Sequence, residues 1–130
     1  MRTKLVLAGL GVATVGATLG GIAMAADPTS NTVAPYAQAA ATVNANGNIA
    51  QKTNTVTSVS NPTTGSYCVV LASGVQASKA IPMATLSNTA TRGSGVRVSR
   101  NDPSCPANSI RVTTSTDGAV ANQPFYLLVP

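Results

Sequence analysis

The chain has 130 residues, a formal net charge of +5, eight Lys or Arg residues against three acidic ones, and no His. The lack of His excludes catalytic triads with a histidine base and histidine-ligated metal sites, so we expect no cofactor and no metal. The four aromatic side chains are too few to form stacking platforms for single-stranded nucleic acid, so we expect no specific nucleic-acid partner.

Residues 1–25 have the order of a secretory signal peptide. Arg2 and Lys4 precede an apolar run that extends to Ala25 and closes with the small-residue pattern Ala-Met-Ala. We predict cleavage after Ala25 and a secreted, extracellular protein that has no membrane partner after cleavage. The apolar run is also long enough to cross a bilayer of about 30 Å, so a retained membrane anchor is the alternative.

Residues 26–35, "ADPTSNTVAP", contain two prolines and many turn formers without an apolar period, which predicts a flexible leader. Residues 36–130 then form the domain, and this length supports one hydrophobic core without room for a second. Their many Thr, Val, Ser and Asn residues favour strands joined by turns. A disordered chain is the alternative, but its high net charge is missing.

The first half of the domain contains three predicted strands. Residues 36–43 are rich in Ala, yet we favour a strand because the hairpin signal Asn46-Gly47 follows. Residues 55–60 form the next strand, and the turn "NPTTG" leads to a third over residues 65–71. A period of two separates the faces of this third strand, with Tyr67, Val69 and Leu71 on one side and Ser66, Cys68 and Val70 on the other.

The second half begins with a predicted strand over residues 80–86, in which Pro82 marks an edge or a bulge. After a loop over residues 87–95, residues 96–99 and 110–114 alternate apolar and polar side chains, so each has one dry and one wet face. Asp117-Gly118 marks another turn. Residues 124–129 are apolar on both faces, which predicts a strand covered on both sides.

The number and spacing of these short strands predict an all-β protein. We expect a single small antiparallel β-sandwich, similar in architecture to immunoglobulin or fibronectin domains, and prefer it to a barrel. No internal repeat is visible.

Cys68 and Cys105 are the only two cysteines, and in an exported chain they predict one disulfide. The bridge would tie the Pro-containing loop "NDPSCPANS" to a central strand and stabilise the fold by about 4 kcal/mol. A redox or catalytic thiol is the weaker alternative, because the chain has no His to lower a thiol pKa and no C-x-x-C spacing.

Four arginines are close in sequence and are candidate anion-facing residues: Arg92, Arg97, Arg100 and Arg111. They invite a polyanion interpretation, with a cell-surface polymer as partner. The competing interpretation is a solvated sheet face, because Arg97 and Arg111 alternate with apolar residues. We favour the solvated face.

The residues leave little room for catalysis, so we predict that the chain is not an enzyme and has no catalytic residue. Asp102 and Asp117 could pair on a glycosidic bond, but Asp102-Pro103 and Asp117-Gly118 are turn sequences in which Asp binds the local backbone. The segment "SKAIPMA", residues 78–84, places a lysine near a proline, as an inhibitor loop for secreted hydrolases would.

Three segments, "YAQAAATVNANGNI", "GSYCVVL" and "IRVTTSTDGAVANQPFYLLV", occur in an order that resembles small secreted proteins of actinobacterial type with no assigned function. The resemblance implies export and an all-β domain, and it carries over no catalytic or binding residue. We expect a secreted, non-enzymatic extracellular structural or interaction module, whose partner is an extracellular protein or a cell-surface polymer. Inhibition of secreted hydrolases and weak polyanion binding are the alternatives.

Overall fold

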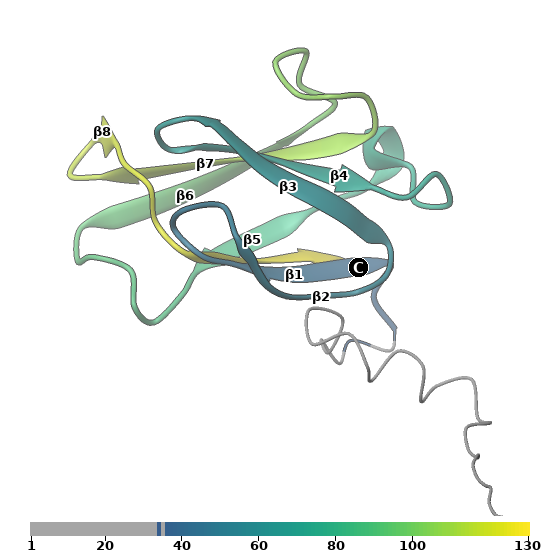
Figure 1. Ribbon diagram of the computed structural model, residues 1–130, viewed down its shortest axis with the longest axis horizontal. Coiled ribbons are helices and arrows are strands. Elements are labelled where there is room, and N and C mark those ends of the chain that lie inside the picture. Colours follow the sequence, from purple (N-terminus) through teal and green to yellow (C-terminus); the bar gives the residue numbers. More distant parts are fainter. Residues whose placement is uncertain (1–33, 35) are drawn as a thin grey trace, which may run out of the picture.

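Two antiparallel sheets pack face to face in the computed structural model, which describes residues 34 and 36–130 (Figure 1). The predicted β-sandwich is therefore confirmed. The predicted signal peptide and all of the predicted leader except Ala34 lie outside the described residues.

Sheet 1 has the strand order β2-β1-β9-β5. It consists of β1 (Ala39–Val43), β2 (Ile49–Lys52), β5 (Met83–Leu86) and β9 (Phe125–Val129). Sheet 2 has the order β3-β4-β7-β6, and a short strand β8 pairs with β7. It consists of β3 (Val56–Thr63), β4 (Ser66–Leu71), β6 (Ser94–Arg100), β7 (Ser109–Thr116) and β8 (Ala119–Val120). A 3-10 helix, η2 (Ala77–Lys79), lies between β4 and β5.

The core lies between the two sheets and is formed by inward-pointing residues of every strand except β2 and β8. Tyr67 of β4 and Phe125 of β9 meet there edge to face, with ring centroids 5.0 Å apart. The Tyr67 hydroxyl donates a hydrogen bond of 2.6 Å to the carbonyl of Ala45, and burial raises the Tyr67 pKa. Both faces predicted for residues 65–71 are confirmed, because Tyr67, Val69 and Leu71 are all in the core.

Several predicted boundaries are shifted. β1 begins at Ala39 rather than at Tyr36, which lies in a turn. β5 begins at Met83, since η2 and Pro82 occupy the preceding residues. β3 continues through Pro62, which an edge strand tolerates because one side of its backbone needs no ladder hydrogen bonds.

The turn between β3 and β4 is consequently shorter than predicted. It is made by Thr64 and Gly65, and Gly65 has a φ of +73°. A side chain at this position would approach the Thr114 carbonyl oxygen to 2.6 Å, so only glycine fits the turn. The predicted turns at Asn46-Gly47 and Asp117-Gly118 are confirmed, with positive φ angles at Gly47, Asp117 and Gly118.

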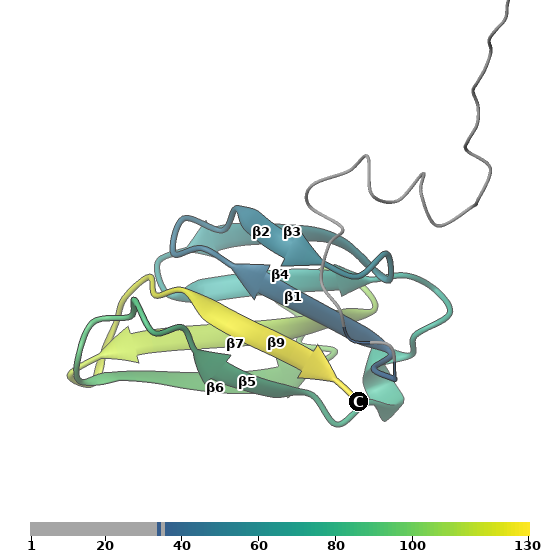
Figure 2. The same cartoon turned by 90° about the horizontal axis from the view of Figure 1, so that it is seen from below.

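The prediction that the last strand is covered on both faces is wrong. Phe125, Leu127 and Val129 enter the core, but Tyr126 on the outer face is 42% exposed. Figure 2 shows β1, β9 and β5 side by side on this side of the molecule. The outer face of sheet 1 is thus an apolar surface that none of the described strands covers.

Candidate functional site

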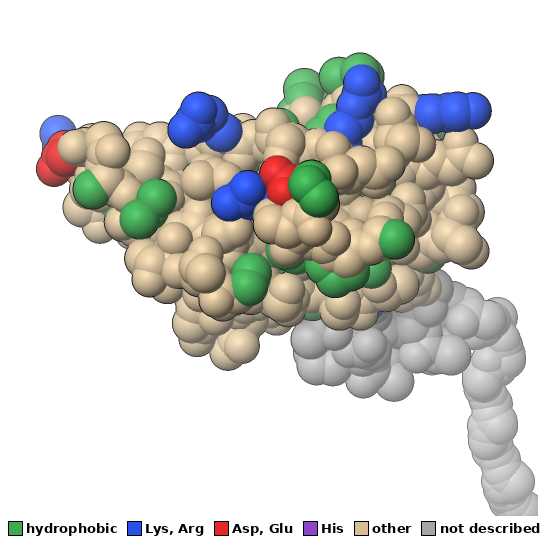
Figure 3. All heavy atoms as spheres, turned by 90° about the horizontal axis from the view of Figure 1, so that it is seen from above, with side chains coloured by type: hydrophobic (Ala, Val, Ile, Leu, Met, Phe, Trp, Pro, Cys, Tyr) green, Lys and Arg blue, Asp and Glu red, His purple; other side chains and the backbone are tan. Residues whose placement is uncertain are grey.

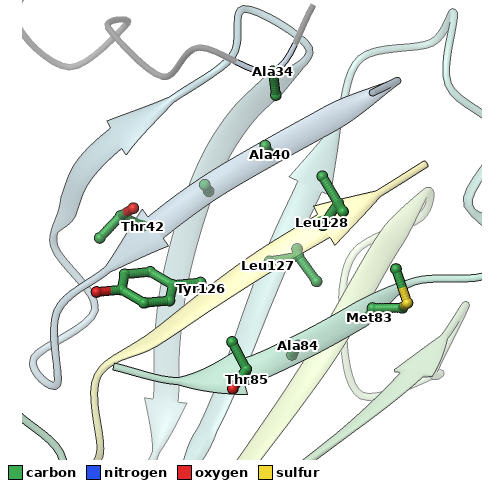
Figure 4. A pocket seen from close by; sticks show the side chains of 10 residues that line it. Ala34, Ala40, Thr42, Met83, Ala84, Thr85, Tyr126, Leu127 and Leu128 are labelled. Carbon is green, nitrogen blue, oxygen red and sulfur yellow. The ribbon is translucent and has the colours of Figure 1, made fainter. Parts of the chain in front are cut away.

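The outer face of sheet 1 carries an open hollow of about 540 Å³ (Figure 4). Three neighbouring strands form its floor, and Ala34 lies at its rim. The side chains of the floor that point outward are Ala40 and Thr42 from β1, Tyr126 and Leu128 from β9, and Met83 and Thr85 from β5.

The strand register arranges these side chains in two rows. Leu128 lies opposite Ala40 on one side and Met83 on the other, which makes a wholly apolar row. The next row places Tyr126 between Thr42 and Thr85, so that each member carries a hydroxyl group. The hollow therefore has an apolar side toward the end of β9 and a side that can form hydrogen bonds.

None of the described residues that line the hollow is charged. Met83 is 52% exposed, and Tyr126 also remains accessible to solvent. Exposed apolar side chains that gather in one place are typical of binding surfaces. The described lining places hydroxyl groups beside exposed apolar side chains, an arrangement that suits binding of a partner.

The four predicted anion-facing arginines do not form one cluster. Arg97 of β6 and Arg111 of β7 point outward from sheet 2 and line a shallow hollow of about 360 Å³ with Val98, Ser99 and Thr113. Arg92 is exposed in the loop between β5 and β6. Figure 3 shows Lys and Arg side chains spread over the outer face of sheet 2 rather than gathered.

Arg100 has a different environment. It lies opposite Ile110 in the register, on the inward-facing side of β6, and its Nη1 donates a hydrogen bond of 2.5 Å to the carbonyl of Ala80. Its guanidinium therefore lies at the edge of the sandwich beside the segment that leads into β5.

Arg111 is held by partners in the protein. Its Nη1 is 3.1 Å from Oδ2 of Asp102, and its Nε donates to the Ser66 hydroxyl at 3.1 Å. Hydrogen bonds from the hydroxyl and backbone N–H of Ser104, and then from Arg111, lower the Asp102 pKa to about 2. No side-chain hydrogen bond or ion pair joins the Arg97 guanidinium to another residue of the described domain. Arg97 is the arginine of this pair that is left for a ligand.

The predicted disulfide is confirmed: Cys68 and Cys105 are bonded, with their Cα atoms 5.5 Å apart. Cys68 points outward from sheet 2 yet is only 1% exposed, because the loop over residues 101–108 folds back over it. The Asp102–Arg111 ion pair fastens the same loop. Both cysteines therefore serve the structure, and no free thiol exists among the described residues.

The other candidate groups lie apart. Asp117 is in the turn after β7, whereas Asp102 is fastened to the outer face of sheet 2, and no group of three metal-ligating side chains occurs in the described part of the chain. Residues 78–84 form the end of η2, an extended connection and the start of β5. Ile81 in this connection is 69% exposed.

No family model matches the chain, and no curated protein or solved structure is significantly similar to it. Within the described residues, no helix is long and apolar enough to span a bilayer. The surfaces of the described domain are therefore the features from which a function can be inferred.

Sequence reasoning missed the hollow. The available signal was the apolar residues on both faces of residues 124–129, which we interpreted as a fully covered strand. Partner strands with small outward side chains, such as Ala40, leave such a face open instead.

Proposed function

We propose that the chain is a secreted, non-enzymatic β-sandwich that acts outside the cell as a structural or interaction module. Export is supported by the signal-peptide pattern, and a structural disulfide suits an oxidising compartment. A non-enzymatic role is supported by a sequence without His and by two cysteines committed to the disulfide.

The observation that carries the proposal is the uncharged apolar hollow on the outer face of sheet 1. Its two rows suit a partner that presents apolar groups beside a few hydrogen-bonding groups. We therefore assign the contact surface of the module to this face.

Photocrosslinking in the producing culture tests the proposal. A photoreactive phenylalanine analogue replaces Tyr126 in the hollow, and in a matched control it replaces Arg97 on the outer face of sheet 2. We expect a discrete adduct with an extracellular component from position 126 and not from position 97. Equal labelling at both positions, or none at either, would contradict the assignment.

A polyanion-binding function is the second candidate, and the pairing of Arg97 with Arg111 over one hollow favours it. It predicts retention on an anionic column that fades at modest salt concentration. Arg97→Gln should shorten this retention, while Arg92→Gln, which removes an exposed arginine from the loop, should change it less.

A further inference from the structure

Three of the five large apolar side chains that are exposed in the described domain lie near one end of sheet 1. β5 and β9 lie side by side (Figure 2), with Met83 at the start of β5 opposite Leu128 near the end of β9, and Ile81 lies two residues before Met83. Tyr36 lies at the same end, because two residues later the backbone N–H of Gln38 donates to the Val129 carbonyl. These side chains are 97% exposed at Tyr36, 69% at Ile81 and 52% at Met83.

Two cations flank this end. Lys79 is exposed at the last turn of η2, two residues before Ile81. The hydrogen bond from Arg100 to the Ala80 carbonyl places a guanidinium beside the residue that precedes Ile81. Ile81 and Arg100 also line a common hollow of about 460 Å³, formed by residues 80–82 and 98–100. We call Lys79, Ile81, Met83 and Arg100 the basic apolar corner.

The carboxylate side chains of the domain are placed elsewhere. Asp102 is paired with Arg111 on the outer face of sheet 2. Asp117 follows Thr116 in the chain. Thr116 pairs with Ser94 at the end of the β6–β7 ladder that is farthest from Arg100. The basic apolar corner therefore combines exposed apolar side chains with two cationic side chains.

We infer, in departure from the sequence-based expectation of no membrane partner, that the basic apolar corner docks the protein on an anionic lipid bilayer. Ile81 and Met83 enter the boundary between head groups and acyl chains, while Lys79 and Arg100 meet the anionic head groups. A second copy of the chain does not fit, because its corner would bring like charges together. A purely polar polyanion would leave the apolar side chains exposed to water.

This inference rests on the proposed function, since it names the partner of the surface that includes the hollow of sheet 1. Met83 belongs to both the corner and the apolar row of the hollow. Bilayer contact would therefore cover the apolar row and leave the row of Tyr126 nearer to water.

The test uses the protein recovered from culture medium and two kinds of vesicle, phosphatidylcholine alone and phosphatidylcholine mixed with phosphatidylglycerol. We expect cosedimentation with the mixed vesicles and much less with the neutral ones. Lys79→Gln should weaken binding to the mixed vesicles about fivefold. Ile81→Ser should weaken it about tenfold, because the apolar side chain no longer enters the bilayer.

Matched controls lie away from the corner. Val120→Ser removes an apolar side chain that is 64% exposed in β8, which pairs with the far end of β7. Arg92→Gln removes an exposed cation from the loop between β5 and β6, near the end of β6 opposite Arg100. Both should bind the mixed vesicles within about twofold of the unchanged protein. Ile81 is exposed, so its replacement leaves the core intact, and thermal unfolding of each variant checks this.

Three outcomes would overturn the inference. They are no vesicle binding, equal binding to neutral and anionic vesicles, and weakening by the control variants as large as by the corner variants. The inference would also be overturned if light scattering showed that the unchanged protein is a dimer and the Ile81→Ser variant a monomer. That result would assign the corner to contact with a second copy of the chain. A crosslink from position 126 to an extracellular protein, without vesicle binding, would leave the proposed function standing and this inference refuted.

Discussion

Asn108 fastens the end of the disulfide loop to the core through its side-chain amide. Its Nδ2 donates to the carbonyls of Leu71, Ala72 and Val75 at 2.9 to 3.1 Å, and its Oδ1 accepts from the backbone N–H of Ala77. Asn108→Ala leaves these groups without partners, so we expect the free energy of unfolding to fall by about 3 kcal/mol in urea denaturation.

The control for this prediction is Asn54→Ala. Asn54 is exposed and forms no side-chain hydrogen bond within the described domain, so its replacement should change stability by less than about 0.5 kcal/mol. Equal losses in the two variants would show that the amide network of Asn108 is not what stabilises this region.

Asp102 makes part of the stability depend on acid pH. Its pKa is lowered to about 2 in the folded protein from an ordinary value of 3.8, so its contribution is present above about pH 4 and is lost as the pH falls through 2. Asp102→Asn should therefore lower the melting temperature near pH 6 and have little effect near pH 2. Asp117→Asn, in the turn after β7, is the control. A difference for Asp102→Asn that stays constant over this range would contradict the assignment.

These two residues differ in how far sequence could identify their roles. The turn context of Asp102 was readable, and its bonds with Ser104 two residues away are local. The partners of Asn108 are more than thirty residues distant in sequence. The Asn108 side-chain hydrogen bonds form only when β4 and β7 pair, so no local sequence pattern predicts them.

At the scale of an element, the loop over residues 101–108 is held by the disulfide. Replacing both Cys68 and Cys105 by Ala should lower the free energy of unfolding by about 4 kcal/mol, because the unfolded chain regains the freedom of a long loop. The denaturant midpoint of the double variant measures this loss, and reduction of the unchanged protein should produce a loss of similar size. If the free energy of unfolding falls by less than about 1 kcal/mol both in the double variant and in the reduced protein, the other contacts of the loop are enough to hold it in place.

The strands themselves were largely predictable. Val96, Val98, Ile110 and Val112 face the core as their alternation indicated. The exact ends of the strands were not predictable from the sequence. The helix η2 before β5 and the continuation of β3 through Pro62 depend on neighbouring elements rather than on local periodicity.

At the scale of the molecule, the prediction concerns export. We expect the protein in culture medium to have the intact mass of residues 26–130 less two hydrogens, because cleavage follows Ala25 and one disulfide forms. Mass spectrometry of the medium and of the membrane fraction measures this. Full-length chain confined to the membrane fraction would instead support the alternative of a retained anchor.

Local sequence patterns were enough to predict the all-β character, the turns at Asn46-Gly47 and Asp117-Gly118, and the disulfide between the only two cysteines. The strands follow from the alternation of apolar and polar residues, and the turns follow from the backbone preferences of Asn, Asp and Gly. The disulfide follows because each cysteine has only one possible partner in the chain. Tertiary structure alone decided that Arg97 and Arg111 come together while Arg100 lies at another edge. It also decided that the second face of β9 stays open, since strand order is set by contacts between distant segments of the chain.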